Sequence, residues 1–436
     1  MKPPLLVVAT LVATTLAIAN ASAQTAPTPP KPNVIVVVWD DVGWEDVIVA
    51  RTPVLDAFSP ASRIYVNHRS CPICSPTRAG LHFGRLPSRD GCGAGLHVLS
   101  LLDHGVPKST ESLAERLGAE GYATGMFGKW HVSTVNDVQN VLTAANEHGY
   151  DTWRAGKTAS ISTTGSHYNW PRIDDGVETT ETTYASEAVN DAFVAWWNST
   201  PGPKYANVSM FAPHVPYDAA PPHLLPVGYP TPTTPREKYE SSITALDTLL
   251  LEMAVAILPD LSNTYVFLVS DNGPPSDIAL PTTKWDEHKG WPYEGGVLVP
   301  LLVWGPGVLP GVEPSLVQSA DVPATVCDLL GVAAPSTALD SVSFAATLSG
   351  LAGKRTDLFT HAFSIGSTLP FDTDRWAVVR KNGLKLVSID GVLELFDLKN
   401  DPTEQNPLDL GDSHWSTAAA LLQATADAIL GPTWPN

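Results

Sequence analysis

Short β-branched runs alternate along the chain with longer segments whose apolar residues have helical spacing. The first run, NVIVVVW at Asn33–Trp39, is continuously apolar, which is typical of a strand buried on both faces of a parallel sheet. Similar runs predict further strands at residues 122–127, 205–211 and 264–269. Helical spacing predicts helices at residues 110–117, 182–197 and from 235 onward. This alternation predicts an α/β fold with a mostly parallel sheet flanked by helices.

Local signals also predict where two of these helices begin and which face they bury. Thr110 is expected to cap the first helix, and Thr234-Pro235 suit the N-cap and first helical positions of the third. The residues expected to face the core are Ala185, Ala188, Val189, Ala192, Phe193 and Trp196 in the second helix, and Tyr239, Ile243, Leu246, Leu250 and Met253 in the third. Residues 154–180, rich in Ser, Thr, Gly and Asp, are expected to form a long surface loop.

The pattern changes after residue 354. Lys381-Asn382-Gly383 lies between two strand-like runs and is a hairpin signal, and residues 392–398 are expected to add a strand. A helix is expected at residues 416–429. The sequence therefore predicts an α/β catalytic domain at residues 24–354 and a small C-terminal α+β subdomain with an antiparallel sheet at residues 355–436.

The first 23 residues have the pattern of a signal peptide. One positive residue, Lys2, precedes an apolar stretch that ends in the small-residue cleavage site Ala21-Ser22-Ala23, so the mature chain is expected to begin near Gln24. No later stretch has the ~20 apolar residues that a membrane helix needs. These features predict a periplasmic or secreted protein without a membrane span.

Composition narrows the class of partner. The formal net charge of −19 argues against nucleic acid and against an anionic membrane, because both need a basic surface. An apolar content of 44% in a chain of this length is enough for a large core. An anionic ligand would have to be held by local positive groups.

Four of the predicted segments end in residues that can bind a metal or an anion. These endings are Asp40-Asp41, Gly128-Lys129-Trp130-His131, Pro213-His214 and Asp271-Asn272-Gly273. The carboxyl ends of parallel strands meet at one edge of a sheet, where ligands bind, so these side chains are expected to lie close together. The oxygen donors suit Ca²⁺ or Mg²⁺ and do not suit zinc.

Two cysteines, Cys71 and Cys74, lie three positions apart in a chain with only four. A structural zinc site would need two more ligands than the sequence offers nearby, and a thioredoxin-like couple would need Cys71 to open a helix. The helix is expected to start later, with Ser75 as its cap and Pro76 at its first position. For Cys71, a disulfide to Cys92 or Cys327 and a buried thiol both remain open.

Cys74-Ser75-Pro76-Thr77-Arg78 resembles the sulfatase signature, a Cys followed by Pro two residues on and Arg four residues on. In that family a maturation enzyme oxidises the cysteine to formylglycine. Residues 84–85 and the stretch PSRDGCGAG at 87–95 are similar to the continuation of the signature, and the other motifs follow in the family's order from Asp40 to Leu398. The resemblance implies a formylglycine-dependent type I sulfatase with an alkaline-phosphatase-like core.

The resemblance also implies a role for each candidate residue. Formylglycine made from Cys74 would act as a hydrate, one hydroxyl attacking sulfur and the other losing its proton to release sulfate. The catalytic residues implied are Cys74, Arg78 to hold the hydrate, Lys129 to contact sulfate and hydrate, His131 as the base, and His214 with Lys289 to grip sulfate and assist the leaving oxygen. The metal ligands implied are Asp40, Asp41, Asp271, Asn272 and the residue made from Cys74, with Ca²⁺ preferred to Mg²⁺.

The expected function is hydrolysis of a sulfate monoester, with a sulfated carbohydrate as the first substrate class and aryl sulfates as the second. The partners implied are this substrate and a formylglycine-generating maturation enzyme. Residues 154–180 and 217–233 are candidate specificity loops, in which Tyr168 and Trp170, like Trp291 further on, either stack on a sugar ring or pack in the core. The alternatives are a phosphonate monoester or phosphodiester hydrolase of the same superfamily and a binding protein that keeps the fold.

Overall fold

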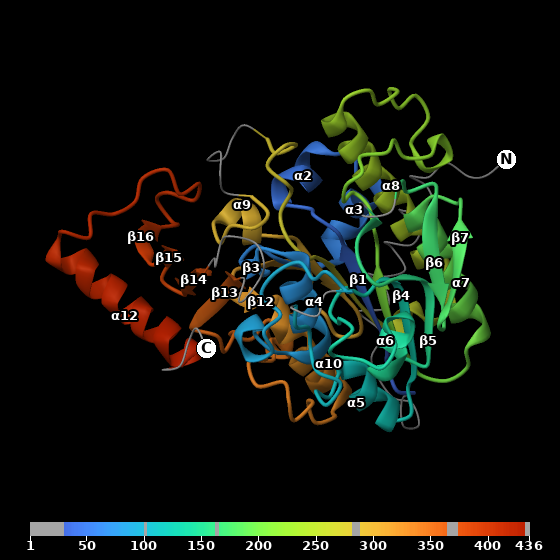
Figure 1. The fold of residues 1–436 in the computed structure, drawn as a ribbon, viewed down its shortest axis with the longest axis horizontal. Helices are drawn as coiled ribbons and strands as arrows, with labels where there is room; N and C mark the ends of the chain where they lie inside the picture. Colours follow the sequence, from blue (N-terminus) through green and yellow to red (C-terminus); the bar gives the residue numbers. More distant parts are fainter. Residues whose placement is uncertain (1–29, 100–102, 162–164, 281–287, 364–373, 432–436) are drawn as a thin grey trace.

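The centre of the molecule is a ten-stranded sheet built around the first apolar run of the chain (Figure 1). The structure is a computed structural model that describes residues 30–99, 103–161, 165–280, 288–363 and 374–431, so the predicted signal peptide lies outside the described residues. The strands, in the order of the sheet, are β11 (Gly311–Glu313), β2 (Arg63–Tyr65), β10 (Leu301–Trp304), β9 (Thr264–Ser270), β1 (Asn33–Trp39), β8 (Lys204–Ser209), β4 (Ala123–Lys129), β5 (Thr152–Lys157), β6 (Trp170–Asp174) and β7 (Val177–Glu181).

The middle of this sheet is parallel, and its outer strands are mostly antiparallel. Strand β1 pairs in parallel with β8 and β9, and β4 pairs in parallel with β5 and β8. Antiparallel pairing begins at β10 on one side and at β6 on the other. All residues of β1 are buried, as a central strand covered on both faces requires. The predicted α/β fold with a mostly parallel sheet is confirmed.

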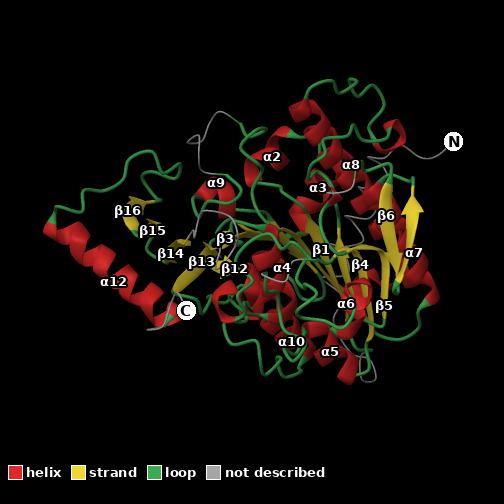
Figure 2. Cartoon of the chain, in the orientation of Figure 1, coloured by secondary structure: helices red, strands yellow, loops and turns green. Residues whose placement is uncertain are grey.

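Helices cover both faces of the sheet (Figure 2). Alternate residues of β1 point to opposite faces, so Ile35 and Val37 belong to one apolar core and Val34 and Val36 to the other. The first core is completed by α3 (Pro53–Phe58), α7 (Ala185–Ser199) and α8 (Pro235–Ala256), and the second by α4 (Cys74–Phe83), α5 (Leu113–Ala119), α6 (Ala144–Glu147), α10 (Val322–Leu330) and α11 (Ala345–Leu348). Two further helices are short: α2 (Trp44–Val49) comes after β1, and α9 (Glu294–Val297) comes before β10.

The helix boundaries confirm one predicted cap and correct another. Thr234 caps α8, accepting a hydrogen bond from the amide of Glu237, and the five apolar residues predicted to face inward are buried. The prediction that Thr110 caps α5 was wrong, because Ser112 is the cap and exchanges hydrogen bonds with Glu115. In α7, Ala192 and Trp196 are only half-buried, and Trp197 takes the buried position instead.

The prediction of a long surface loop at residues 154–180 was wrong. This segment contains the end of β5 and the hairpin of β6 and β7. The turn between them is Asp175-Gly176, and both residues have positive φ, 45° and 89°. An Asp-Gly pair between two extended runs is a strong hairpin signal, but the polar composition of β7, which is mostly exposed, concealed it.

A separate four-stranded antiparallel sheet lies at the left of Figure 1, drawn in orange and red. Its strands are β13 (Asp357–Phe363), β14 (Asp374–Arg380), β15 (Leu384–Ile389) and β16 (Val392–Asp397), and α12 (Ser413–Leu430) packs against β14 and β15. The hairpin predicted at Lys381-Asn382-Gly383 is confirmed. A two-stranded sheet of β3 (His68–Arg69) and β12 (Val317–Gln318) lies between the two larger sheets, and the predicted domain boundary at 354/355 stays a prediction. Within the described residues no helix has the length and apolarity of a membrane span.

Candidate active site

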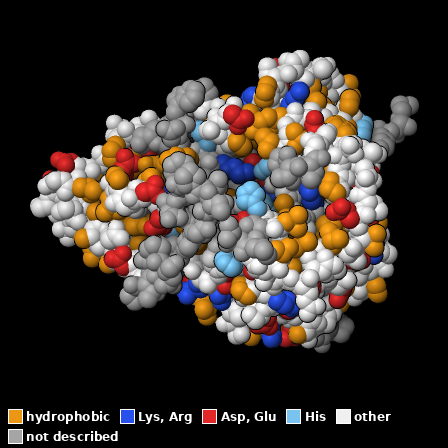
Figure 3. Space-filling model, in the orientation of Figure 1, with side chains coloured by type: hydrophobic (Ala, Val, Ile, Leu, Met, Phe, Trp, Pro, Cys, Tyr) orange, Lys and Arg blue, Asp and Glu red, His pale blue; other side chains and the backbone are white. Residues whose placement is uncertain are grey.

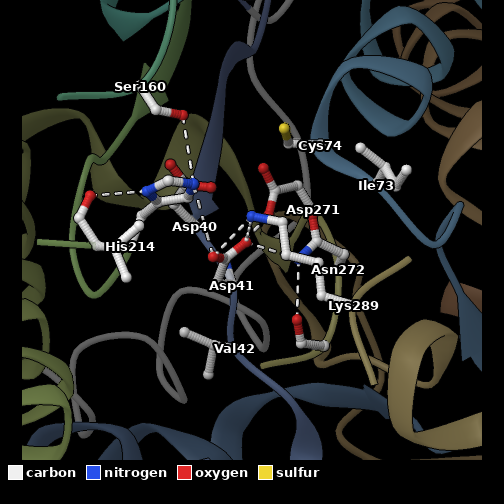
Figure 4. Close-up of polar contacts among 12 residues, drawn as sticks. Asp40, Asp41, Val42, Ile73, Cys74, Ser160, His214, Asp271, Asn272 and Lys289 are labelled. Atoms are coloured by element: carbon white, nitrogen blue, oxygen red, sulfur yellow. Dashed lines mark hydrogen bonds and ion pairs between the residues drawn. The ribbon is translucent and has the colours of Figure 1, made fainter. Parts of the chain in front are cut away.

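The predicted site residues come together beyond the carboxyl ends of β1, β4, β8 and β9 (Figure 4). Asp40 and Asp41 follow β1, Lys129 ends β4, and Asp271 and Asn272 follow β9. The remaining members are Cys74 and Arg78 on α4, His131 after β4, His214 after β8 and Lys289 before α9. Parallel pairing of the central strands therefore gathers side chains that are up to 250 positions apart in the sequence.

Cys74 is the first residue of α4, so the helix starts two residues earlier than expected. Ile73 occupies the N-cap position without a side-chain cap bond, and Pro76 is the third helical residue. The prediction that Ser75 caps this helix was wrong, because its Oγ accepts a hydrogen bond from the amide of Leu96 at 3.2 Å. Thr77 supports the turn instead, accepting from the amide of Cys71 at 3.0 Å. Cys74 keeps the predicted place at the amino end of a helix, where free N–H groups favour an anion.

His131 is in hydrogen-bond range of the sulfur atom. Its Nδ1 lies 3.3 Å from Cys74 Sγ, and its Nε2 lies 3.0 Å from the carbonyl oxygen of Leu96. Since a carbonyl only accepts, we assign the ring proton to Nε2, which leaves Nδ1 as a proton acceptor facing residue 74. Burial, reinforced by Lys129, holds the pKa of His131 well below its ordinary value. Ser75 thus orients His131 through Leu96.

Three buried carboxylates in the site each have a cation. Lys129 Nζ lies 2.7 and 3.0 Å from the two oxygens of Asp40, and Lys289 Nζ lies 2.6 and 2.8 Å from those of Asp41. The guanidinium of Arg78 holds Asp271, with Nε and Nη2 at 2.9 and 2.8 Å. All six belong to the predicted set. The exposed fractions of the Arg78 and Lys129 side chains are both 0%, so this arrangement lies in a low-dielectric environment.

Burial and these neighbours shift the acid–base properties of the cluster. Burial raises the pKa of the Cys74 thiol, while Lys129 and Lys289 oppose that shift. Burial also raises the pKa of Asp271, and Asp40 adds to it. For Asp41, burial acts in the same direction, but Lys289 and His214 outweigh it, so the pKa lies below the ordinary value. Opposed shifts on neighbouring groups are typical of catalytic sites.

The oxygen donors fit a hard divalent cation. The side chains of Asp40, Asp41 and Asp271 offer carboxylate oxygens, and Asn272 Nδ2 donates to Asp41 Oδ1 at 2.6 Å. The Oδ1 of Asn272 is buried and has no hydrogen-bond partner among the described residues, which leaves an acceptor for a cation. The potential ligand atoms of Asp40, Asp41 and His214 also lie within 4.8 Å of one another, so His214 is a candidate ligand outside the metal-binding set that the resemblance implied.

His214 has one further neighbour that the sequence did not reveal. Its Nδ1 donates to the carbonyl of Val215 at 2.8 Å, and its Nε2 lies 3.3 Å from Ser160 Oγ and 3.7 Å from Asp41 Oδ2. Burial, with Lys289 and Lys129, holds the pKa of His214 well below its ordinary value. Ser160 follows β5 in a stretch of similar small polar residues, so nothing in its local pattern could have identified it.

Two site residues have strained backbone, which their neighbours maintain. Asp41 and His131 have φ values of 68° and 60°. These are left-handed values that non-glycine residues adopt at a cost of about 1–3 kcal/mol, and such residues cluster at functional sites. Gly128 lies in β4 at the shift in register with β5, just before Lys129. Its φ is 87°, and a Cβ there would lie 1.9 Å from the carbonyl oxygen of Ser209, so the position requires glycine.

The remaining sequence candidates fall outside the cluster. The four cysteines are all described, buried and free, so Cys71 is a buried thiol without a disulfide, and burial raises its pKa to about 11. Trp170 is buried in the core against Phe211, which removes it as a sugar platform. Tyr168 is partly exposed, and its hydroxyl donates to the carbonyl of Ala219.

Comparisons with known proteins agree with this geometry. The family model named Sulfatase matches residues 32–332. The N-acetylgalactosamine-6-sulfatase of Canis lupus familiaris is 27% identical over 362 residues, covering 74% of this chain and 66% of the relative. An arylsulfatase of Hemicentrotus pulcherrimus is 25% identical over 340 residues, covering 70% of this chain and 59% of the relative. The chain therefore spans two thirds or less of the length of these curated relatives.

The solved structures establish the fold. The crystal structure of Ps i-CgsB in complex with k-i-k-neocarrahexaose has a TM-score of 0.77 at 22% identity and covers 93% of this chain and 94% of that one. The predicted alkaline-phosphatase-like core with a small antiparallel C-terminal sheet is thus confirmed.

Proposed function

The chain belongs to the sulfatase family, and from this premise we propose that it hydrolyses sulfate monoesters through a formylglycine made from Cys74. The observation that carries the proposal is the position of Cys74 Sγ, 3.3 Å from an unprotonated ring nitrogen of His131. Two buried cations, Arg78 and Lys129, and the partly buried Lys289 lie around the same point. A structural thiol needs neither a base nor such a density of positive charge, whereas sulfuryl transfer needs a nucleophile, a base and anion stabilisation together.

Each neighbouring side chain has a defined task under this proposal. When formed, the aldehyde hydrate supplies two hydroxyls on one carbon: one attacks sulfur as the alcohol departs, and loss of the other's proton releases sulfate and restores the aldehyde. His131 Nδ1 accepts that proton, and Leu96 keeps Nε2 protonated. Lys129 and Arg78, already placed by Asp40 and Asp271, present positive charge to the sulfate.

Of the pair predicted to assist the leaving oxygen, Lys289 is the better proton donor. Burial lowers its pKa, but Asp41 more than compensates, so the pKa lies above the ordinary value and the amine keeps its proton. His214 has its Nδ1 proton committed to Val215, and its Nε2 carries a lone pair. We therefore assign proton donation to Lys289 and sulfate contact to His214.

We propose Ca²⁺ as the cation, held by Asp40, Asp41, Asp271, Asn272 and residue 74. The unpartnered Oδ1 of Asn272 and the excess of carboxylate oxygen support an oxygen-only set, and calcium tolerates an irregular shell better than Mg²⁺ does. When bound, the ion would add positive charge at a sulfuryl oxygen. His214 would enter the shell only if the site held a transition metal, since imidazole suits such ions.

A sulfated carbohydrate is the proposed substrate class. The support is that the relatives include an N-acetylgalactosamine-6-sulfatase and that the similar structure of Ps i-CgsB holds a neocarrahexaose. An exported protein, matured by a formylglycine-generating enzyme and then directed to the periplasm or the exterior, would meet such polymers. This location rests on the signal-like residues 1–23.

The test compares three substrates with matched variants. Wild-type protein produced with an active maturation enzyme should release sulfate from 4-nitrophenyl sulfate faster than it cleaves bis(4-nitrophenyl) phosphate or a phosphonate monoester. Cys74→Ala should lose this activity and Cys71→Ala should keep it. Preference for the phosphodiester or phosphonate would support the alternative hydrolase. A Cys74 that stays unmodified in protein produced with an active maturation enzyme would favour a binding protein.

A further inference from the structure

The site opens to solvent beside Lys289. The exposed fraction of the Lys289 side chain is 20%, against 10% for His214 and 0% for Asp41. This exposure favours an exit for the alcohol part of a substrate on the side of Lys289, next to Gly290 and Trp291 in the chain. Lysine or arginine and histidine side chains gather near the middle of the face shown in Figure 3.

The C-terminal sheet supplies an arginine at this rim. Arg375, in β14, stacks on Trp291 with its guanidinium carbon 3.8 Å from the ring centroid. Its Nη1 donates to the carbonyl oxygen of Gly290 at 3.2 Å, next to Lys289 in the chain. The stack and this hydrogen bond hold the guanidinium plane in one orientation.

Within the described residues, Arg375 has no carboxylate at ion-pair distance, unlike almost every other arginine. Eleven of the chain's thirteen arginines, all of them within the described residues, form an ion pair with a carboxylate. Arg375 and Arg51 do not. The Nε of Arg375 is also buried without a hydrogen-bond partner in the described part of the chain, and burial lowers its pKa. Asp390 acts on the guanidinium only from beyond ion-pair distance. In a protein with a net charge of −19, the guanidinium of Arg375 is therefore available to an external anion.

We propose that Arg375 binds a second anionic substituent, a carboxylate or a further sulfate, on the sugar unit that carries the scissile sulfate ester or on its neighbour. The inference rests on the proposed sulfatase function and adds the substrate class: a doubly anionic saccharide. A guanidinium fork matches the planar oxygens of both groups, and its position beyond Lys289 places it on the leaving-group side of the site. Trp291 orients the fork.

The test uses Arg375→Gln with Arg51→Gln as the matched control, because Arg51 also lacks a carboxylate and lies 5.3 Å from an aromatic ring, that of Tyr229. The substrates are 4-nitrophenyl sulfate, which has no second anion, a glucosamine 2-N,6-O-disulfate, and sulfated uronate disaccharides. Arg375→Gln should raise KM at least about tenfold for a doubly anionic sugar, as expected for loss of a charge-assisted contact, and leave 4-nitrophenyl sulfate turnover unchanged. Arg375→Lys should recover part of the loss.

The sugar that responds identifies the anion as sulfate or carboxylate. Equal loss on all substrates, or no loss on any, overturns the proposal, as does the same effect in Arg51→Gln. Calorimetric binding of the same sugars to Cys74→Ala separates the two hypotheses. If wild type releases no sulfate, the proposed function fails, while about tenfold weaker binding on adding Arg375→Gln would still support the anion site. Unchanged binding, or none to any doubly anionic sugar, contradicts it.

Discussion

Two clusters of charged side chains lie at opposite ends of the segment from Lys289 to Glu294, and they differ in the uncharged polar groups and thiols that accompany the charges. The cluster to which we assign catalysis, called the catalytic cluster below, contains three carboxylates and three cations around Cys74. The interface cluster joins the core to the C-terminal sheet: Glu294 contacts Arg69 at 2.6 Å and Lys385 at 2.7 Å, and Lys385 also contacts Glu404 at 2.8 Å. Both clusters are deeply buried, so burial does not distinguish them.

The two clusters are distinguished by the histidine, thiol and amide groups that lie next to their ion pairs. The interface cluster balances two cations against two carboxylates and has no histidine or thiol among its members, and its neighbours hold the pKa of Glu294 down at about 2, against burial. The catalytic cluster adds a thiol, two histidines of lowered pKa and the unpartnered oxygen of Asn272. A buried ion network with reactive and unsatisfied members indicates chemistry, whereas one that closes on itself indicates a structural joint.

Replacing Cys74 should have the largest effect and should fall on activity alone. Cys74→Ala is expected to lower sulfate release by on the order of 10⁴-fold or more, because the nucleophile is lost. The free energy of unfolding should change by about 1 kcal/mol, since only a small side chain is removed. Initial rates with 4-nitrophenyl sulfate and urea unfolding measure the two. Cys71→Ala, the equally buried neighbour, is the control and should remain active.

Substitution of two equally buried lysines, one in each cluster, should have opposite effects on stability and on kcat. The side chains of Lys129 and Lys385 both have an exposed fraction of 0%, and each contacts carboxylate oxygens at 2.7 Å. Lys385→Met should lower the free energy of unfolding by about 3–5 kcal/mol, because Glu404 loses its cation and Glu294 loses one of two. Its kcat should stay close to wild type while the protein is folded.

Lys129→Met should lower kcat by about 10²–10³-fold, because it removes charge that acts on the transition state. Urea unfolding and steady-state kinetics on both variants give a two-by-two result. If Lys385→Met loses activity as strongly as Lys129→Met does, the division into catalytic and structural clusters is wrong.

Removing the cation should affect only the catalytic cluster. Dialysis against a chelator is expected to abolish activity and to lower stability, by about 2.7 kcal/mol relative to a calcium concentration one hundred times the Kd. Thermal unfolding with and without Ca²⁺ measures the effect. Asp41→Asn should lose this dependence, while Lys385→Met should keep it in full because the two sites are separate. Stability that does not respond to calcium in wild type would argue against the assigned ligands.

The smallest predicted effect concerns His148, a fully buried histidine outside the catalytic cluster. Burial lowers the pKa of His148 to about 3, and neither of its ring nitrogens has a hydrogen-bond partner among the described residues. The unfolded chain binds a proton near pH 6.5 and the folded chain does not, so stability falls as pH drops below about 6.5. His148→Leu should reduce this slope by about 1 kcal/mol per pH unit on average between pH 5 and 7, and by about 1.4 kcal/mol per pH unit at the acidic end, measured by urea unfolding, with kcat retained. An unchanged slope would contradict the buried neutral state.

The parts of the fold that sequence predicted are those set by local pattern. The β-branched run of β1, the Thr234 cap of α8 and the Asn-Gly turn between β14 and β15 each contain their own signal within a few residues. The order of the strands in the large sheet has no such local signal. Strand β1 lies between β8 and β9, and the residues that pair with β1 are about 170 and 230 positions away. Short outer strands such as β2 and β11, three residues each, carry too little pattern to detect.

The site shows the same division. Motifs and a family resemblance predict a site at residues 40, 41, 74, 78, 129, 131, 214, 271, 272 and 289, and the structure brings these residues together. The contacts that were not predicted are tertiary ones. Ser75 accepts a hydrogen bond from Leu96 instead of capping α4, and Ser160, after β5, lies in hydrogen-bond range of His214, after β8. Such pairings exist only once the chain has folded.

The most direct test of the central claim is the mass of the tryptic peptide from Ser70 to Arg78 after denaturation and alkylation with iodoacetamide. This peptide contains both Cys71 and Cys74, so the first is an internal control for the second. In protein that was produced with an active maturation enzyme and releases sulfate, we expect Cys71 to be alkylated. We expect residue 74 to be an aldehyde, which has O in place of the H₂S of the cysteine. Alkylation of both cysteines in fully active protein would contradict this expectation.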